Sequence, residues 1–135
     1  IEDDVGTLEV LRKRLQSDGI MFITVPAFEF LWAGHDISNH HMRRYNSKSL
    51  KSVLSESGFN GHYISYFNFW LFPIVCTVRK IKNIFGNAKA VSDAKMPNKF
   101  ANNILTKIFG SERFLLGKMS LPFGVSLMAT AKKAY

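Results

Sequence analysis

A short apolar run comes directly after a helix-forming segment, with only a tight turn between them. The run "IMFITV", Ile20 to Val25, shows no alternation with strongly polar residues, and Pro26 ends it. This pattern predicts a strand buried on both faces, which is typical of a parallel sheet covered by helices. In the preceding segment, Asp3 or Asp4 is expected to cap a helix. Its apolar stripe is formed by Val5, Leu8, Leu11 and Leu15.

Helix, turn and buried strand make half of a βαβ unit. The strand that completes this unit is therefore expected upstream of Ile1. Gly19 is expected to take the left-handed backbone position that ends the first helix.

Further along, "NSKSLKSVLSESGF" predicts a second helix, capped by Asn46 or Ser47 and closed by Gly58. Two more strands are expected, at about His62 to Asn68 and about Val125 to Ala131. Between them, residues 71–123 form an insertion with two amphipathic helical stripes. The fold class expected is α/β, with residues 1–135 as a single domain.

Positive charge is concentrated in the second part of the chain. Up to Gly58 there are seven Lys and Arg against eight Asp and Glu, a balance of −1; from Phe59 onward there are eleven against two, a balance of +9. This excess indicates an anionic partner, or else lysines that keep an apolar segment in solution. The chain contains no recognisable nucleic-acid motif, so no nucleic-acid partner is expected.

The compartment expected is the cytoplasm. Cys76 is the chain's single cysteine, so no internal disulfide can form. The first residues do not have the pattern of a secretory leader. The longest apolar run near the middle, Phe69 to Val78, is too short for a membrane span.

The loop "HDISNHHMRRY", residues 35–45, carries the polar side chains best suited to chemistry. Several interpretations remain open. His35, Asp36, His40 and His41 could bind a metal, although their spacing does not favour it. His41 could act as a general base, with Asp36 holding one tautomer of its ring. Arg43 and Arg44 could clamp a carboxylate or phosphate of the substrate. Alternatively, Asp36 pairs with Arg43 or Arg44 to fix the loop while Tyr45 packs.

The residues around this loop are apolar. Phe28, Phe30, Leu31 and Trp32 could line a pocket for a hydrophobic acceptor, or they could pack the loop against the insertion.

Three stretches resemble the C-terminal half of a class I S-adenosylmethionine-dependent methyltransferase, in its UbiE/type 11-like branch. They are "IEDDVGTLEVLRKRLQSDGIMFITVPAF", "LWAGHDISNHHMRRYNSKSLKSVLSESGF" and "SLMATAKK". The resemblance implies a partial Rossmann-like sheet in which the last strand inserts between the other two, antiparallel to both. It also implies S-adenosylmethionine as cofactor and a small-molecule or lipid-like acceptor. The chain departs from the family at Asp18, where a glycine is usual, and at His40, where a small residue, often glycine, is usual.

The family's glycine-rich cofactor loop and its ribose-binding acidic residue have no counterpart in this chain. The chain is therefore expected to be a fragment, inactive alone, of a larger methyltransferase. The candidate catalytic residues are His41 and Asp36. Candidate substrate-binding residues are His35, Arg43, Arg44, Tyr45 and Trp32.

Two kinds of association are expected. An unpaired edge on the strand of residues 20–25 favours a homodimer or other association through that edge. The insertion is either a helical lid over the sheet or a surface that contacts a membrane peripherally. The rival to the enzyme interpretation is a non-catalytic module whose basic helices dock on an anionic membrane or on a partner subunit.

Overall fold

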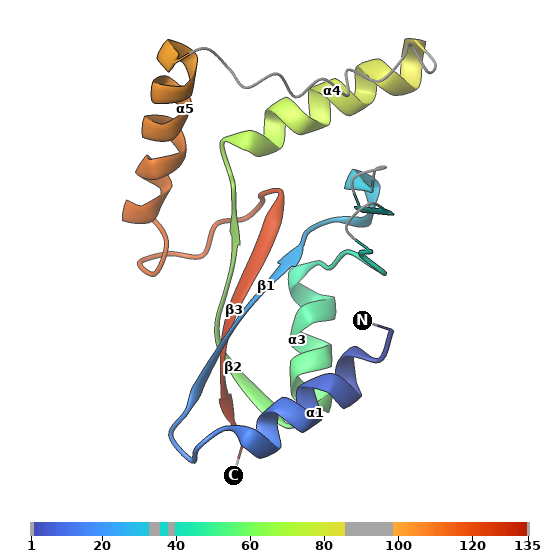
Figure 1. The fold of residues 1–135 in the computed structure, drawn as a ribbon, viewed down its shortest axis with the longest axis vertical. Helices are drawn as coiled ribbons and strands as arrows, with labels where there is room; N and C mark the ends of the chain where they lie inside the picture. The colour runs from blue at the N-terminus through green and yellow to red at the C-terminus, as the bar shows by residue number, and fades with distance from the viewer. Residues whose placement is uncertain (1, 33–35, 38–39, 86–98, 135) are drawn as a thin grey trace.

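Three strands form one open sheet in the computed structural model, which describes residues 2–32, 36–37, 40–85 and 99–134. The strands are β1 (Ile20–Pro26), β2 (Phe59–Phe67) and β3 (Ser126–Lys133), in the order β1-β3-β2 (Figure 1). β3 is antiparallel to both neighbours, so β1 and β2 run in the same direction. This order and direction confirm the expectation for the last strand. The bounds differ slightly, since β2 begins at Phe59 and β3 ends at Lys133.

Two helices, α1 (Asp4–Arg14) and α3 (Ser47–Glu56), lie on one side of the sheet (Figure 1). Asp3 caps α1 by accepting a hydrogen bond from the Gly6 N–H at 2.8 Å. Asn46 and Ser49 form a reciprocal capping box at the start of α3. These caps satisfy backbone donors that a helix start otherwise leaves unpaired. Both helices are where the sequence pattern predicts them.

The main core lies between α3 and the sheet. Leu50 and Leu54 of α3 pack against the face of β3 that carries Leu127, Ala129 and Ala131, all of them buried. Burying each leucine stabilises the fold by about 1.5–3 kcal/mol. Small alanines on the central strand allow the helix layer to approach the sheet closely.

The turn residues at the helix ends differ from expectation at one position. Gly58, which was predicted to close the second helix, has a φ of +75°, a left-handed conformation. Gly19 does not have a positive φ, so the prediction for the first helix is wrong. α1 ends at Arg14, and the chain leaves it through Leu15 in an extended conformation. The turn before β1 is therefore built without a left-handed glycine.

The prediction that the first strand is buried on both faces is also wrong. Ile20 and Phe22 of β1 are 60% and 59% exposed. The helices cover one face, and on the other face a return segment is fastened to β2. There, the Tyr63 hydroxyl accepts from Gly117 N–H and donates to the Met119 carbonyl, while Ser65 Oγ accepts from Leu121 N–H. Since β2 is on the far side of β3, these contacts leave β1 uncovered.

Helices α4 (Leu71–Phe85) and α5 (Lys99–Ser111) extend beyond one end of the sheet (Figure 1). The short 3-10 helices η1 (Glu29–Leu31) and η2 (Glu112–Phe114) adjoin them. The helical insertion is thus confirmed in its described parts. Within the described residues, no helix is long and apolar enough to span a bilayer.

Candidate active site

The loop that follows β1 lies at the carboxyl end of the strand, where open α/β sheets bind ligands. The chain leaves β1, passes through η1 and returns beside the strand end. There, Tyr45 N–H donates to the Pro26 carbonyl at 2.9 Å, and Phe28 N–H donates to the Tyr45 carbonyl at 2.8 Å. Ala27 and Tyr45 thereby form a parallel bridge. This bridge brings the two ends of the segment 27–45 together beside the end of β1.

Asp36 and Arg44 form a buried ion pair inside the loop. Asp36 is fully buried, and the Arg44 side chain is 8% exposed. Arg44 donates from Nε and Nη2 to the two carboxylate oxygens, at 3.0 Å each, and from Nη1 to the Ala27 carbonyl at 2.9 Å. All three guanidinium nitrogens are therefore engaged by the protein, which matches the loop-fixing interpretation for Arg44.

His41 shares the same carboxylate. Its Nδ1 lies 3.1 Å from Asp36 Oδ1, and its backbone N–H donates to the Asp36 carbonyl at 2.8 Å. The neutral tautomer that donates from Nδ1 leaves Nε2 as an acceptor. The His41 side chain is 37% exposed, in contrast to buried Asp36. The pair thus has the geometry of a general base oriented by a carboxylate.

His41 lines a groove of about 800 Å³ between α1, β1 and the loop. Its walls are mainly apolar: one face of α1 with Leu8, Leu11 and Leu15, and every residue of β1. Its polar groups at the loop end come from Asp4, His40, His41, Arg43 and Tyr45. A mainly apolar groove with polar groups at the loop end suits a ligand with an apolar body and a polar group near His41.

A second polar cluster anchors the start of α1 to the loop. The Tyr45 hydroxyl donates to Asp4 Oδ2 at 2.6 Å, and Arg43 Nη1 donates to the same oxygen at 3.3 Å. The hydrogen bond from Tyr45, together with the Arg43 charge, holds the pKa of Asp4 below its ordinary value, while partial burial opposes this. Burial and the bond to Asp4 raise the pKa of Tyr45 above its ordinary value. In this arrangement Arg43 and Tyr45 hold protein groups together beside the groove.

Among the residues that the structure describes, three non-glycine residues have a positive φ, and they lie near this end of the sheet. Phe28 (φ +56°) follows β1, Asn68 (φ +58°) follows β2, and His40 (φ +53°) precedes His41. A positive φ is strained for side chains other than glycine, and such residues concentrate at functional sites.

Aromatic packing joins the loop to the insertion. Phe28 stacks on Tyr66 with ring centroids 4.8 Å apart and lies 5.5 Å from Phe72 of α4. Phe30 also contacts Phe72, and Phe72 contacts Phe123. Phe28 and buried Leu31 therefore pack the loop, as one of the two interpretations expects, whereas Phe30 remains 63% exposed.

The remaining candidate residues are placed as follows. Trp32 follows η1 and is partly buried. His35 lies outside the described residues. Among the residues that the structure describes, no group of three or more His, Cys, Asp or Glu side chains is arranged to hold a metal ion.

Sequence reasoning missed two acidic residues of the site. Asp4 was considered only as a helix cap, and Glu29, whose Oε2 accepts from Arg44 N–H at 3.2 Å, was not considered. Tyr45 is 41 residues from Asp4 along the chain and Arg44 is 15 residues from Glu29, so no local pattern marked either carboxylate.

Comparison of the chain with protein-family models, with curated proteins and with solved structures finds no match. The described residues also do not fit S-adenosylmethionine. A dinucleotide-type cofactor site needs a glycine-rich turn between the end of a strand and the start of a helix. Among the described residues, Gly19 and Gly58 stand directly before β1 and β2, and Gly117 and Gly124 precede β3, so none of these four joins the end of a strand to the start of a helix.

Proposed function

We propose that this chain is the acceptor-binding part of an S-adenosylmethionine-dependent methyltransferase, and that it acts on a small-molecule or lipid-like acceptor. The observation that carries the proposal is the Asp36–His41 pair, in which a buried carboxylate orients an imidazole at the mouth of a mainly apolar groove. The strand order β1-β3-β2, with the last strand antiparallel to both others, supports it.

The role of this chain is to position the acceptor and remove its proton. The acceptor's apolar body lies along Leu8, Leu11 and Leu15, and its hydroxyl or amine reaches His41. The cofactor would supply a methyl group whose bond to sulfur breaks as the acceptor heteroatom bonds to its carbon, with S-adenosylhomocysteine as the leaving group. His41 Nε2 would take the proton of that heteroatom, and Asp36 would stabilise the resulting imidazolium. Residues outside those described must hold the cofactor.

The experiment is an assay of labelled methyl transfer by the full-length product of the reading frame that encodes this chain. The acceptor panel contains phenols, polyprenyl phenols and hydroxylated lipids. We expect turnover that falls by about 10²–10⁴-fold in His41→Ala, the usual contribution of a general base. Lys51→Ala is the control, because Lys51 is exposed on α3 and does not line the groove. Absence of transfer to every acceptor, or full activity of His41→Ala, contradicts the proposal.

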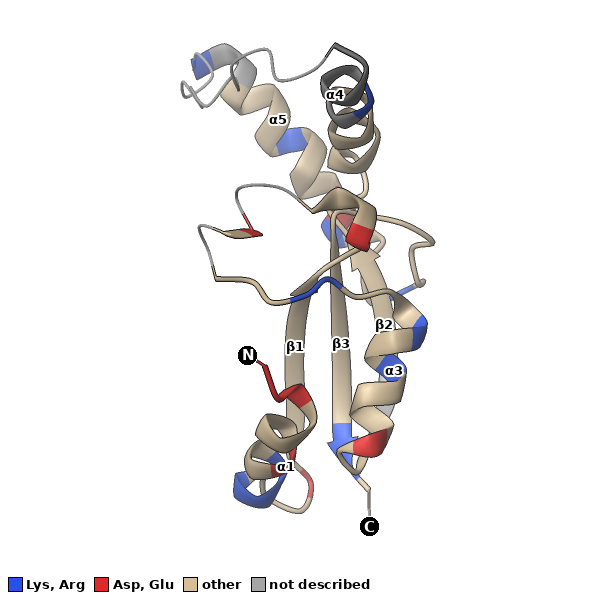
Figure 2. Ribbon diagram, turned by 90° about the vertical axis from the view of Figure 1, so that its right-hand side faces the viewer, with Lys and Arg blue, Asp and Glu red and all other residues tan. Residues whose placement is uncertain are grey.

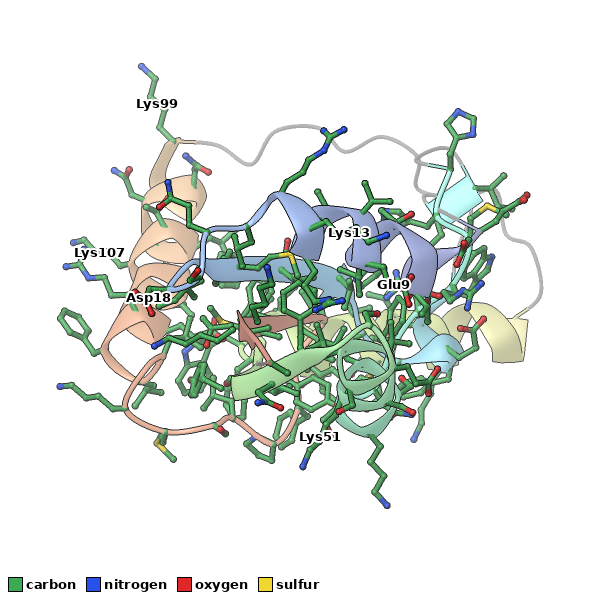
Figure 3. The ribbon with its side chains drawn as sticks, turned by 90° about the horizontal axis from the view of Figure 1, so that it is seen from below. Glu9, Lys13, Asp18, Lys51, Lys99 and Lys107 are labelled. Carbon is green, nitrogen blue, oxygen red and sulfur yellow. The ribbon has the colours of Figure 1, made fainter. Side chains whose placement is uncertain are left out.

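A second candidate function is docking to an anionic membrane, favoured by the surface of α4 and α5. Trp70, Ile74 and Val78 recur every four residues and are 42–52% exposed. Among the described residues of 69–125, the exposed charges are all positive: Lys80, Lys99, Lys107, Arg113 and Lys118, while Glu112 is buried. Lys99 and Lys107 point away from the rest of the molecule (Figure 3). Exposed apolar side chains combined with basic ones are typical of helices that lie in a bilayer interface.

Co-sedimentation with vesicles of neutral and of anionic lipid tests this candidate. We expect binding to anionic vesicles alone, weakened by high salt and by Ile74→Glu or Lys107→Glu. Lys51→Glu is the control, because Lys51 belongs to α3, away from these helices (Figure 3). Binding that is insensitive to salt and to both variants rules this candidate out.

A further inference from the structure

Arg44 connects the candidate base to the end of β1 through a continuous set of hydrogen bonds. It belongs to the basic stretch, residues 43–44, that precedes α3 and passes beside the end of that strand (Figure 2). Its Nη1 donates to the carbonyl of buried Ala27 at 2.9 Å, and its Nε and Nη2 donate to the two carboxylate oxygens of Asp36. Asp36 Oδ1 in turn lies 3.1 Å from His41 Nδ1. The His41 ring is thus linked through two side chains to the backbone that follows the strand.

The guanidinium of Arg44 fixes the rotation of the Asp36 carboxylate. The terminal torsion of an aspartate has no sharp preference of its own. Two N–H donors from one rigid plane, each on a different oxygen at 3.0 Å, remove this freedom. A lysine ammonium is a single point charge and does not restrict a carboxylate in this way. Because of Arg44, Asp36 Oδ1 therefore has a fixed direction toward the His41 ring.

Arg44 also supplies the counter-charge that Asp36 needs in the interior. Asp36 is fully buried, and the Arg44 side chain is 8% exposed. A buried carboxylate without a partner takes up a proton instead of carrying a charge. A protonated carboxyl group can donate to a ring nitrogen, whereas an ionised carboxylate only accepts. The arginine charge therefore favours the state of Asp36 that accepts a hydrogen bond from His41 Nδ1.

The backbone of His41 is held separately from its ring. The His41 N–H donates to the Asp36 carbonyl at 2.8 Å, so a backbone contact brings the two residues together independently of Arg44. This contact does not distinguish the two ring nitrogens, because it involves no ring atom. Which nitrogen holds the proton is set by the hydrogen bond that the ring itself makes. The position of His41 and the tautomer of its ring thus depend on different contacts.

From these contacts we infer that Arg44 is a positioning residue for the proposed reaction. By fixing the rotation and the charge of Asp36, it keeps the ring proton of His41 on Nδ1 and leaves Nε2 as the acceptor. The inference rests on the proposed role of His41 as the base. It goes beyond a role in fixing the loop, because an arginine that only stabilises the fold does not change which ring nitrogen holds the proton.

The experiment compares the ¹⁵N chemical shifts of the His41 ring in the wild type and in Arg44→Lys, at a pH where the ring is neutral. Lysine retains the charge and loses the two-pronged contact, so we expect the ratio of the Nδ1–H to the Nε2–H tautomer to fall by about fivefold or more. Arg113→Lys, the same change at an exposed arginine of η2, is the matched control and should leave the ratio unchanged. His41→Gln identifies the signals of His41, because it removes them.

A second measurement on the wild type keeps the test decisive if far-UV circular dichroism shows that Arg44→Lys does not fold. The ¹³C chemical shift of the Asp36 carboxyl carbon should be that of an ionised group, and the Arg44 Nε–H should exchange slowly with solvent. A protonated Asp36, a rapidly exchanging Nε–H, or an unchanged tautomer ratio in folded Arg44→Lys overturns the inference.

Methyl transfer by the full-length protein distinguishes this inference from the proposed function. In Arg44→Lys, kcat should fall by about 10–100-fold while KM stays within about twofold, because Arg44 positions the base and does not line the groove. A loss that appears only in KM overturns the positioning role. Absence of transfer by every protein contradicts the proposed function, whereas a tautomer ratio that shifts in Arg44→Lys still supports the effect of Arg44 on His41.

Discussion

Arg44 donates two hydrogen bonds of 3.0 Å to the buried carboxylate of Asp36. The side chain of its neighbour Arg43 is 47% exposed, and its Nη1 lies 3.3 Å from Asp4 Oδ2. Adjacent arginines thus make ion pairs of different kinds. Breaking a buried pair from one side leaves an uncompensated charge in the interior, whereas exposed pairs contribute little.

We therefore predict that Arg44→Ala lowers the free energy of unfolding by about 3–5 kcal/mol. Arg43→Ala should lower it by about 1 kcal/mol or less, and it serves as the matched control. Urea denaturation followed by circular dichroism measures both. Equal losses in the two variants would mean that Asp36 is not held as the structure has it.

The acid stability of the fold should depend on Asp4. The pKa of Asp4 is lowered in the folded state, chiefly by the hydrogen bond from Tyr45. A carboxylate with a lowered folded pKa stabilises the fold above its unfolded pKa, near the ordinary 3.8. That stabilisation is lost as the pH falls through the folded value. The free energy of unfolding of the wild type should thus exceed that of Asp4→Asn by a constant amount around neutral pH, and this difference should shrink below about pH 4.

Denaturation of both proteins at a series of pH values measures this difference. Asp18→Asn, in the exposed turn before β1, provides the control. Below about pH 4, its free energy of unfolding should change with pH as that of the wild type does. A constant difference between the wild type and Asp4→Asn down to pH values well below the ordinary pKa would contradict the role of Asp4.

His40 offers a test of backbone strain in the loop. Because its φ is +53°, His40→Gly should leave the fold as stable as the wild type or slightly more stable. His40→Val should destabilise it by about 1–2 kcal/mol, since a β-branched side chain tolerates this conformation poorly. Thermal unfolding of the two variants gives the comparison. A more stable valine variant would show that this residue does not adopt a left-handed conformation.

Glu112 ties the end of the insertion to the start of α4. It is 4% exposed, and its Oε1 accepts from Phe69 N–H at 2.9 Å. Glu112→Ala should lower the free energy of unfolding by about 1–3 kcal/mol, because a partly buried N–H loses its acceptor. Glu112→Gln retains an acceptor oxygen, so it should recover most of the loss. A glutamine variant as unstable as the alanine variant would assign the effect to packing alone.

Much of the fold could be predicted from local patterns. The apolar stripe of α1, the capping box at Asn46 and the left-handed Gly58 depend on neighbouring residues, which a sequence displays directly. The insertion of β3 between β1 and β2 depends on contacts between distant residues, and it was expected only from the resemblance to a family. The prediction that β1 is buried on both faces was wrong because an apolar run shows only that a strand can be buried. Whether other elements cover each face depends on the rest of the fold.

The sequence indicated most residues of the candidate site, but not which of their side chains form ion pairs and hydrogen bonds with one another. Sequence left open whether Asp36 would meet Arg43 or Arg44, because the choice depends on how the loop turns at His40. The role of Asp4 could not be derived from local pattern, since Tyr45 and Arg43 are some forty residues away along the chain. Ion pairs between segments that are far apart in the sequence form only when the fold brings those segments together, so a local pattern does not predict them.

The central claim is that Asp36 holds the His41 ring with Nε2 available to accept a proton in the groove. The measurement that tests it most directly is the tautomer of His41, read from ¹⁵N chemical shifts of the imidazole nitrogens at a pH where the ring is neutral. The structure predicts a proton on Nδ1 and none on Nε2, with this preference lost in Asp36→Asn. A ring protonated on Nε2 in the wild type would leave the groove without a base and would contradict the proposed function.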